Sequence, residues 1–170
     1  MRSRSTSALG RAVLAASVVL TPAAPAAAGP RRTLALSKVD VGAVEQARAG
    51  ATRKLQDPEC QKLLDDFRDG EGRPLRHNLE SWGMSAAEYV QTISFVRGSS
   101  HRLCLRGNVA LVTTPGFPRV YVCSPFAAIQ VSEPGLAETM LIHEMLHTLG
   151  LGENPPSSLD ITKRVQRRCR

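Results

Sequence analysis

The strongest constraint on the fold is an apolar segment, EPGLAETMLIHEMLHTL, which runs from Glu133 to Leu149. Pro134 suits the first turn of a helix, and Gly150 suits the residue that ends one. The segment is therefore predicted to be a helix. Its apolar side chains place it in the core, yet its second half also carries three ionisable residues, which are rarely buried without partners. These three residues need a chemical explanation.

The three residues are His143, Glu144 and His147. Residues four apart project from one face of a helix, so the two imidazoles can reach a single point. This H-E-x-x-H spacing is typical of zinc sites in which the glutamate is the general base. The alternative is a pair of histidines that are satisfied by hydrogen bonds within a buried helix, without any metal.

A catalytic zinc usually has three protein ligands, so two histidines leave one ligand missing. Glu153 is the best candidate, because Gly150 permits the left-handed conformation that would reverse the chain toward the imidazoles. Alternatively, Glu153 is an exposed loop residue, and His101 or Asp160 completes the site. The predicted ligands are His143, His147 and Glu153.

The pattern His143-Glu144-x-x-His147-x-x-Gly150-x-x-Glu153 resembles the extended motif of the metzincin clan of zinc peptidases, whose third ligand is normally His or Asp. The continuation ENPPSS and the cysteine near the C-terminus are similar to those of small secreted bacterial zincin-like proteins. The resemblance covers residues 141–169. It implies a small sheet beside the active-site helix, with a cleft between them. No methionine follows Glu153, whereas metzincins have a methionine-containing turn beneath the metal.

The motif and the resemblance together predict an exported zinc-dependent hydrolase, a peptidase of zincin type with one Zn²⁺ per chain and a peptide or protein substrate. Glu144 would assist the attack of water on a peptide carbonyl. Tyr121 would either stabilise an oxyanion or simply pack. Two alternatives remain: a non-catalytic zinc-containing module that binds a peptide or protein on the same scaffold, and a disulfide-bonded envelope protein without metal.

The order of the remaining segments predicts a single α+β domain, in which a small antiparallel sheet packs with the active-site helix and flanking helices. Ser85 and Glu88 form a capping-box pattern. The strand at 119–123 could offer an edge to an extended peptide. Helices are predicted over 40–56, 58–67, 75–82, 85–92, 133–149 and 157–169, and strands over 93–98, 102–105, 109–114 and 119–123.

Four cysteines remain after the N-terminal region, an even number that favours two disulfides in an exported protein. Cys104 and Cys123 lie in neighbouring strand-like segments, and Cys60 and Cys169 lie in helix-like segments. We expect the pairs 104–123 and 60–169. A zinc knuckle is less consistent with the sequence, because no two cysteines have its close spacing.

Residues 1–28 have arginines at the start, a short apolar run and a small-residue ending at Ala28, which together predict a cleaved signal peptide. The alternatives are a disordered leader rich in Ala and Pro, or an uncleaved anchor. Residues 29–37 would be a tether and 38–170 the domain, secreted or periplasmic and without a membrane span. The leader holds three arginines and no acid, so the net charge falls from +7 to +4. The basic end, 163–170, is expected to complement a helix dipole rather than contact nucleic acid or anionic lipid.

Overall fold

The computed structural model describes residues 35–170, which belong to one compact unit. The predicted signal peptide and most of the predicted tether lie outside the described residues. The first described helix begins after Ser37, whose hydroxyl accepts a hydrogen bond from the backbone N–H of Asp40. Such a side-chain cap satisfies one of the N–H groups that have no partner within the helix.

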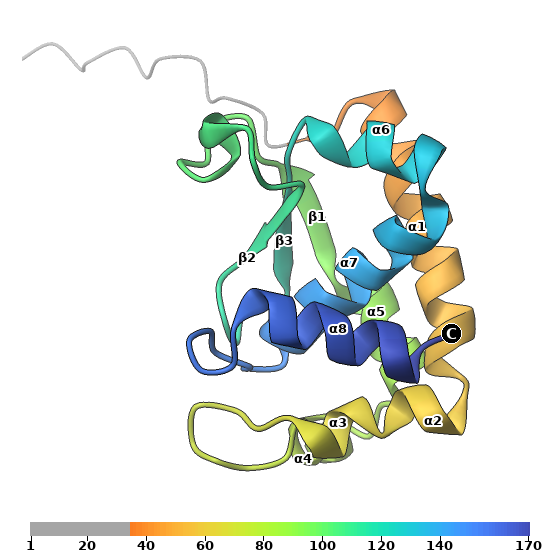
Figure 1. Ribbon diagram of the computed structural model, residues 1–170, viewed down its shortest axis with the longest axis vertical. Coiled ribbons are helices and arrows are strands. Elements are labelled where there is room, and N and C mark those ends of the chain that lie inside the picture. Colours follow the sequence, from red (N-terminus) through yellow and green to blue (C-terminus); the bar gives the residue numbers. More distant parts are fainter. Residues whose placement is uncertain (1–34) are drawn as a thin grey trace, which may run out of the picture. The chain divides into compact units, whose positions relative to one another are not determined.

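The described residues form a mixed α+β fold (Figure 1). The first half is helical, three short strands follow, and helices close the chain. The elements are α1 (Lys38–Leu55), α2 (Pro58–Gln61), α3 (Leu63–Asp66), α4 (Leu75–Ser81), α5 (Ala86–Thr92), β1 (Ser94–Arg97), the 3₁₀ helix η1 (Cys104–Arg106), β2 (Leu111–Thr113), β3 (Arg119–Val122), α6 (Pro125–Ser132), α7 (Pro134–Thr148) and α8 (Ser158–Arg168).

Most of these elements agree with the sequence predictions. The capping box at Ser85 and Glu88 is confirmed at the start of α5. The helix predicted over 58–67 is divided into α2 and α3. The strand predicted over 102–105 is wrong, because this segment turns into η1 and ends at Gly107 in a left-handed conformation. Helix α6 was not predicted.

The sheet is mixed, so the expected antiparallel arrangement is only partly right. The strand order is β1-β3-β2, with β3 parallel to β1 and antiparallel to β2. The prediction that 119–123 offers a free edge is wrong, since β3 is the central strand and is paired on both sides. Strand β2 lies at one edge. The β2–β3 connection docks on α7, where the N–H of Gly116 donates to the carbonyl of His147 at 2.9 Å.

Helix α7 is in contact with α1, α6, α8 and the sheet (Figure 1). Helix α1 presents Ala43, Ala47 and Ala51 to the core, and these small side chains allow α7 to approach closely. A Cβ at Gly50 would overlap the carboxylate of Glu138 on α7. That carboxylate pairs with Lys54 at 3.1 Å across the same contact. Helix α7 is therefore held on several sides by rigid elements.

Both predicted disulfides are confirmed: Cys60 is bonded to Cys169 and Cys104 to Cys123. The first joins the end of α8 to α2, and the second joins η1 to the residue after β3. Disulfides are compatible with an oxidising, extracellular compartment. Within residues 35–170, no helix is both long and apolar enough to cross a bilayer.

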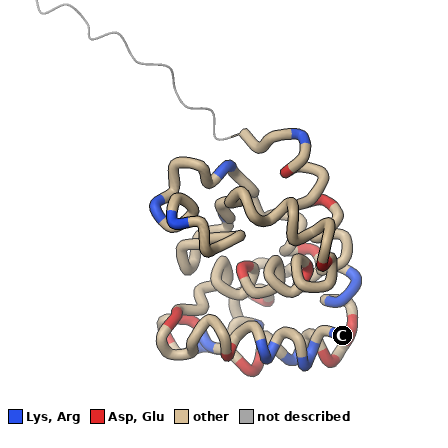
Figure 2. Tube along the Cα trace, turned by 45° about the horizontal axis from the view of Figure 1, so that its top comes forward, with Lys and Arg blue, Asp and Glu red and all other residues tan. Residues whose placement is uncertain are grey.

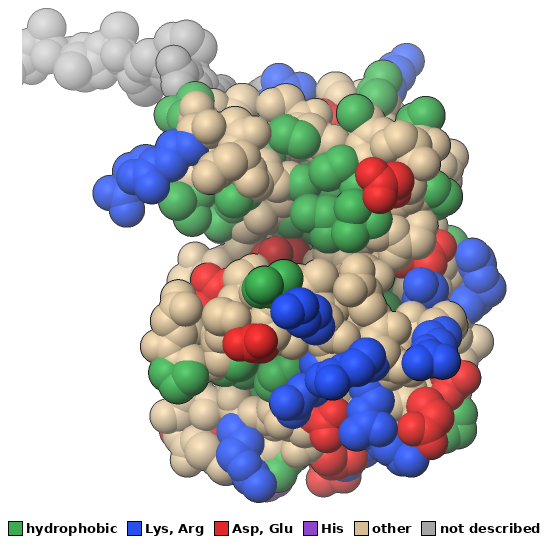
Figure 3. All heavy atoms as spheres, in the orientation of Figure 1, with side chains coloured by type: hydrophobic (Ala, Val, Ile, Leu, Met, Phe, Trp, Pro, Cys, Tyr) green, Lys and Arg blue, Asp and Glu red, His purple; other side chains and the backbone are tan. Residues whose placement is uncertain are grey.

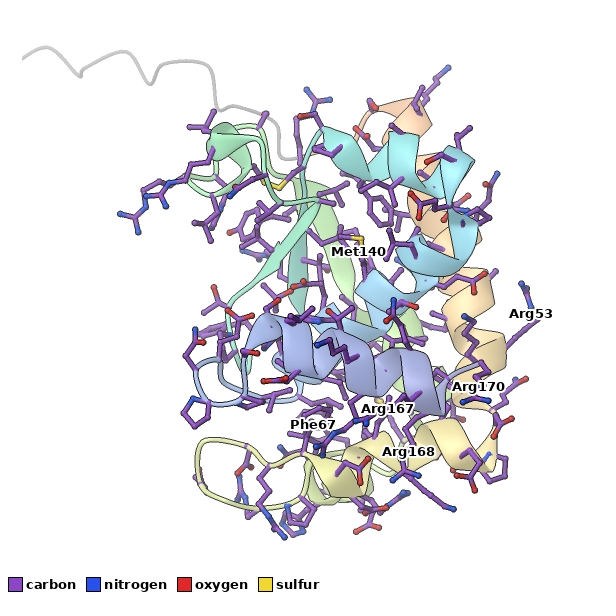
Figure 4. All side chains as sticks on the ribbon, in the orientation of Figure 1. Arg53, Phe67, Met140, Arg167, Arg168 and Arg170 are labelled. Atoms are coloured by element: carbon purple, nitrogen blue, oxygen red, sulfur yellow. A yellow bond between two sulfur atoms is a disulfide. The ribbon has the colours of Figure 1, made fainter. Side chains whose placement is uncertain are left out.

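Arginine side chains on α8 hold this helix against the segment that contains α3. Arg168 forms an ion pair with Asp66 at 3.1 Å, and the guanidinium of Arg164 lies 5.2 Å from the centre of the Phe67 ring. In Figure 4, Phe67 and Arg168 lie between α8 and the helices below it. These contacts, together with the Cys60–Cys169 bond, hold α8 against α2 and α3.

Candidate metal centre

His143 and His147 lie on the last two turns of α7, and their side chains are only 7% and 6% exposed. The apolar residues around them pack into the core, so the helix cannot rotate to bring the imidazoles into solvent. Their Nε2 atoms face each other at 3.0 Å. The i, i+4 spacing thus brings the two ring nitrogens together as predicted.

Each imidazole is oriented through its other nitrogen. Nδ1 of His147 lies 2.7 Å from the carbonyl oxygen of Leu151, which can only accept, so this nitrogen carries the proton. Nδ1 of His143 lies 3.0 Å from the hydroxyl of Thr162 on α8, which can accept in the same way. In this arrangement both Nε2 atoms present lone pairs, as metal ligands require.

Burial further favours a neutral His143. Desolvation, together with the neighbouring His147, lowers the pKa of His143 to about 4. A group with this pKa is uncharged near pH 7, so its nitrogen is available for coordination.

The turn after α7 brings in a carboxylate. Gly150 has a φ of 105°, a conformation that side chains other than glycine rarely adopt. The N–H of Gly150 donates to His147 O and that of Leu151 to Leu146 O, which closes the end of the helix. The chain reverses here, and Oε1 of Glu153 lies 3.6 Å from Nε2 of His147 and 4.0 Å from Nε2 of His143.

These three atoms form a triangle of a size that fits a zinc ion. With sides of 3.0, 3.6 and 4.0 Å, the circle through its corners has a radius of about 2.1 Å. Zinc–nitrogen and zinc–oxygen bonds have about this length, and two imidazoles with one carboxylate are a donor set that zinc accepts. The side chain of Glu153 is 43% exposed, so the site opens to solvent on that side.

The alternative third ligands lie elsewhere. The His101 ring packs at a tilt against the Tyr121 ring, with 4.7 Å between the ring centres, and Asp160 accepts a hydrogen bond from Ser157 at the start of α8. Among residues 35–170, the one group of three ligand side chains within reach of a common ion is His143, His147 and Glu153.

Glu144 lies beside this group without belonging to it. Its side chain faces a cleft and is half-buried, and burial raises the pKa of its carboxyl group. The Thr113 hydroxyl on β2 lies close enough to lower this pKa somewhat, although the two groups are not aligned for a regular hydrogen bond. His147 also lowers the pKa and Glu153 raises it.

The cleft has a volume of about 330 Å³ and lies between the β2 side of the sheet and the start of α8. Figure 3 shows a furrow between α6 and α8, with apolar side chains along its upper side. Met140, one turn before His143, lies on the α7 wall (Figure 4). The lining residues are Gly107, Asn108, Val109, Ala110, Leu111, Pro125, Ile129, Met140, His143, Glu144, Ser158 and Thr162.

Tyr121 does not face this site. Its strand neighbours Val120 and Val122 are buried in the main core, so Tyr121 points to the opposite face of the sheet. There it packs with Cys104, Val112 and Cys123. Of the two roles considered for Tyr121, packing is therefore the one that fits.

Three contributors were not predicted: Thr162, the Leu151 carbonyl and Thr113. Leu151 follows from the same glycine turn that positions Glu153, and helical spacing alone gives no signal for the other two.

Comparison with models of protein families, with curated proteins and with solved structures finds no match. The chemistry of the site therefore rests on its own geometry.

Proposed function

We propose that the protein is a zinc-dependent hydrolase of zincin type that cleaves peptide bonds. The observation that supports this most strongly is the triangle formed by His143, His147 and Glu153, with the Glu144 carboxylate beside it at a cleft. Two oriented imidazoles, a carboxylate ligand and an adjacent non-ligating glutamate are the set that zinc hydrolysis requires.

Each residue has a distinct role. His143 and His147 would hold the metal through Nε2, and Thr162 and Leu151 keep the two rings in the required orientation. Zinc, when bound, polarises a substrate carbonyl and lowers the pKa of a water molecule. Glu144 accepts a proton from the attacking water and returns it to the leaving amine.

The cleft suits an extended peptide. Strand β2 is an edge strand, so one side of its backbone is free of strand partners among the described residues. An extended chain can pair with such an edge and place its side chains in adjoining pockets. The wall formed by Ile129 and Met140 is apolar, which favours an aliphatic side chain next to the bond that is cleaved.

A second candidate function is a zinc-containing module that binds a peptide or protein without cleaving it. The observation in its favour is that residues 154–170 contain no methionine, whereas metzincins place a methionine-containing turn beneath the metal. Metal binding is common to both candidates, and turnover distinguishes them.

The test compares the wild type with Glu144→Gln on a mixed peptide library, with products identified by mass spectrometry. We expect cleavage by the wild type and a loss of about a hundredfold or more in the variant, with zinc content unchanged. Glu138→Gln is the matched control, because Glu138 lies on the same helix but pairs with Lys54. Equal inactivity of wild type and Glu144→Gln across the library would favour the binding module.

A further inference from the structure

The segment that carries the sheet has a one-sided charge composition. Between Glu88 and Glu133 the sequence contains no Asp or Glu, and it contains Arg97, Arg102, Arg106 and Arg119. All four arginines are exposed, and none forms an ion pair within residues 35–170. Figure 2 shows this part of the trace with basic positions and no acidic ones. The segment that carries the sheet therefore has a net positive charge of its own, independent of the net charge of the other segments.

Two of these arginines sit beside exposed leucines at the end of the sheet. Leu105 is 70% exposed and Leu103 is 37% exposed, on the loop that contains η1. Arg102 and Arg106 flank them, giving the sequence RLCLR. The loop projects beyond the strands at the upper left of Figure 1, and Figure 3 shows basic side chains extending from this corner beside apolar ones. We call residues 101–106 the cationic tip.

The cationic tip is anchored from below. Cys104 is buried and bonded to Cys123, and the His101 ring packs at a tilt against Tyr121. The N–H of Leu105 donates to the carbonyl of His101 at 3.1 Å. A Cβ at Gly98 would collide with the Cys104 sulfur, so the loop packs closely against the strand end. The exposed leucines are thus presented by a fixed scaffold, which lowers the entropy lost on binding.

We propose that the cationic tip docks the protein on the surface of an anionic phospholipid bilayer. Leucine side chains enter the boundary between headgroups and acyl chains, while neighbouring arginines remain among the anionic headgroups. An acidic protein partner fits less well, because the tip projects outward rather than forming a groove. Gly107–Leu111 continue from the tip into the cleft wall, so docking would hold the cleft near the bilayer. The inference does not depend on metal or activity.

The test is co-sedimentation of the purified protein with phosphatidylcholine vesicles, with and without phosphatidylglycerol. We expect saturable binding that requires phosphatidylglycerol and weakens at high salt. The double variants Leu103→Ser/Leu105→Ser and Arg102→Glu/Arg106→Glu should each weaken it about tenfold or more. Circular dichroism would establish that both variants are folded.

Matched controls use exposed residues of the same kinds elsewhere on the surface. Val131 is 86% and Leu159 61% exposed, so Val131→Ser/Leu159→Ser should bind as the wild type does. Arg53→Glu/Arg167→Glu gives the same charge change on α1 and α8. Absence of binding to anionic vesicles would overturn the proposal. So would binding that the tip variants leave unchanged, or binding to an acidic polypeptide such as polyglutamate but not to vesicles.

Discussion

The hydroxyl of Thr162 lies 3.0 Å from Nδ1 of His143, and this contact joins α8 to α7. The end of α8 is in turn bonded to α2 through Cys60 and Cys169. The orientation of one imidazole of the candidate metal centre therefore depends on a helix that follows the motif in the sequence. Partners of this kind orient a histidine ligand and tune its basicity.

Thr162→Val keeps the shape of the side chain and removes the hydroxyl. We expect zinc affinity to fall about tenfold, because His143 loses the group that fixes its ring, while Thr162→Ser retains most of the affinity. Competition with a chromophoric chelator measures the effect. Thr139→Val is the matched control, since the Thr139 hydroxyl bonds only to the Gly135 carbonyl within α7. An unchanged affinity in Thr162→Val would show that this contact does not orient His143.

Gly150→Ala tests the turn that carries Glu153. A Cβ would lie 3.2 Å from the Cβ of Asp69, on a residue whose φ is 105°. We expect the free energy of unfolding to fall by about 1–3 kcal/mol, together with weaker zinc binding as the turn relaxes. Denaturant unfolding is the measurement. Gly42→Ala is the control: it has no atom within 4 Å of the added Cβ and lies in α1, where alanine should be neutral or stabilising.

The two disulfides should differ in their effect on stability. Cys60 and Cys169 are 109 residues apart, whereas Cys104 and Cys123 are 19 apart. Closing a longer loop constrains the unfolded chain more, so paired serine substitutions should cost about 5 kcal/mol for the first bond and about 3 kcal/mol for the second. Urea unfolding of the two double variants compares them directly. A larger loss for the 104–123 pair would contradict the loop-length argument.

Acid should weaken the support beneath the glycine turn. Burial raises the pKa of Asp69, but hydrogen bonds from Arg73, Asn78 and Glu71 outweigh it and lower that pKa to about 2. Because this value lies below the ordinary 3.8, the carboxylate stabilises the fold above about pH 4. That contribution is lost as the pH falls toward 2.

The measurement is the free energy of unfolding of wild type and Asp69→Asn at several pH values. The difference between them should be largest above about pH 4 and shrink in more acidic solution. Loss of the Asp69 charge also bears on the candidate metal centre. The Asn78 amide donates to Asp69 at 3.2 Å and to the carbonyl of Leu149, at the end of α7, at 2.8 Å. A difference that stays constant with pH would show that the Asp69 charge does not contribute.

The elements that the sequence predicts well are those with local signals. The limits of α7 follow from Pro134 and Gly150, and the capping box of α5 follows from Ser85 and Glu88. The grouping of Glu153 with the two histidines depends on a single turn of chain, so a glycine at the right place was sufficient to suggest it.

The errors concern partners that are distant along the chain. Three-residue and four-residue strands have no pattern that distinguishes parallel from antiparallel neighbours, so the β1–β3 pairing could not be read from them. The alternation in RLCL resembles a strand, but the bond from Cys104 to Cys123 and the left-handed Gly107 bend this segment into η1. Thr162 approaches His143 from another helix, and only packing determines that contact.

The most direct test of the proposed centre is metal analysis of the purified protein alongside His147→Ala and Glu153→Ala. The account predicts about one zinc per chain in the wild type, none retained by His147→Ala, and a markedly weakened site in Glu153→Ala. A correctly folded wild type that neither contains zinc nor binds added zinc would contradict the account, because the three ligand atoms would then meet for another reason.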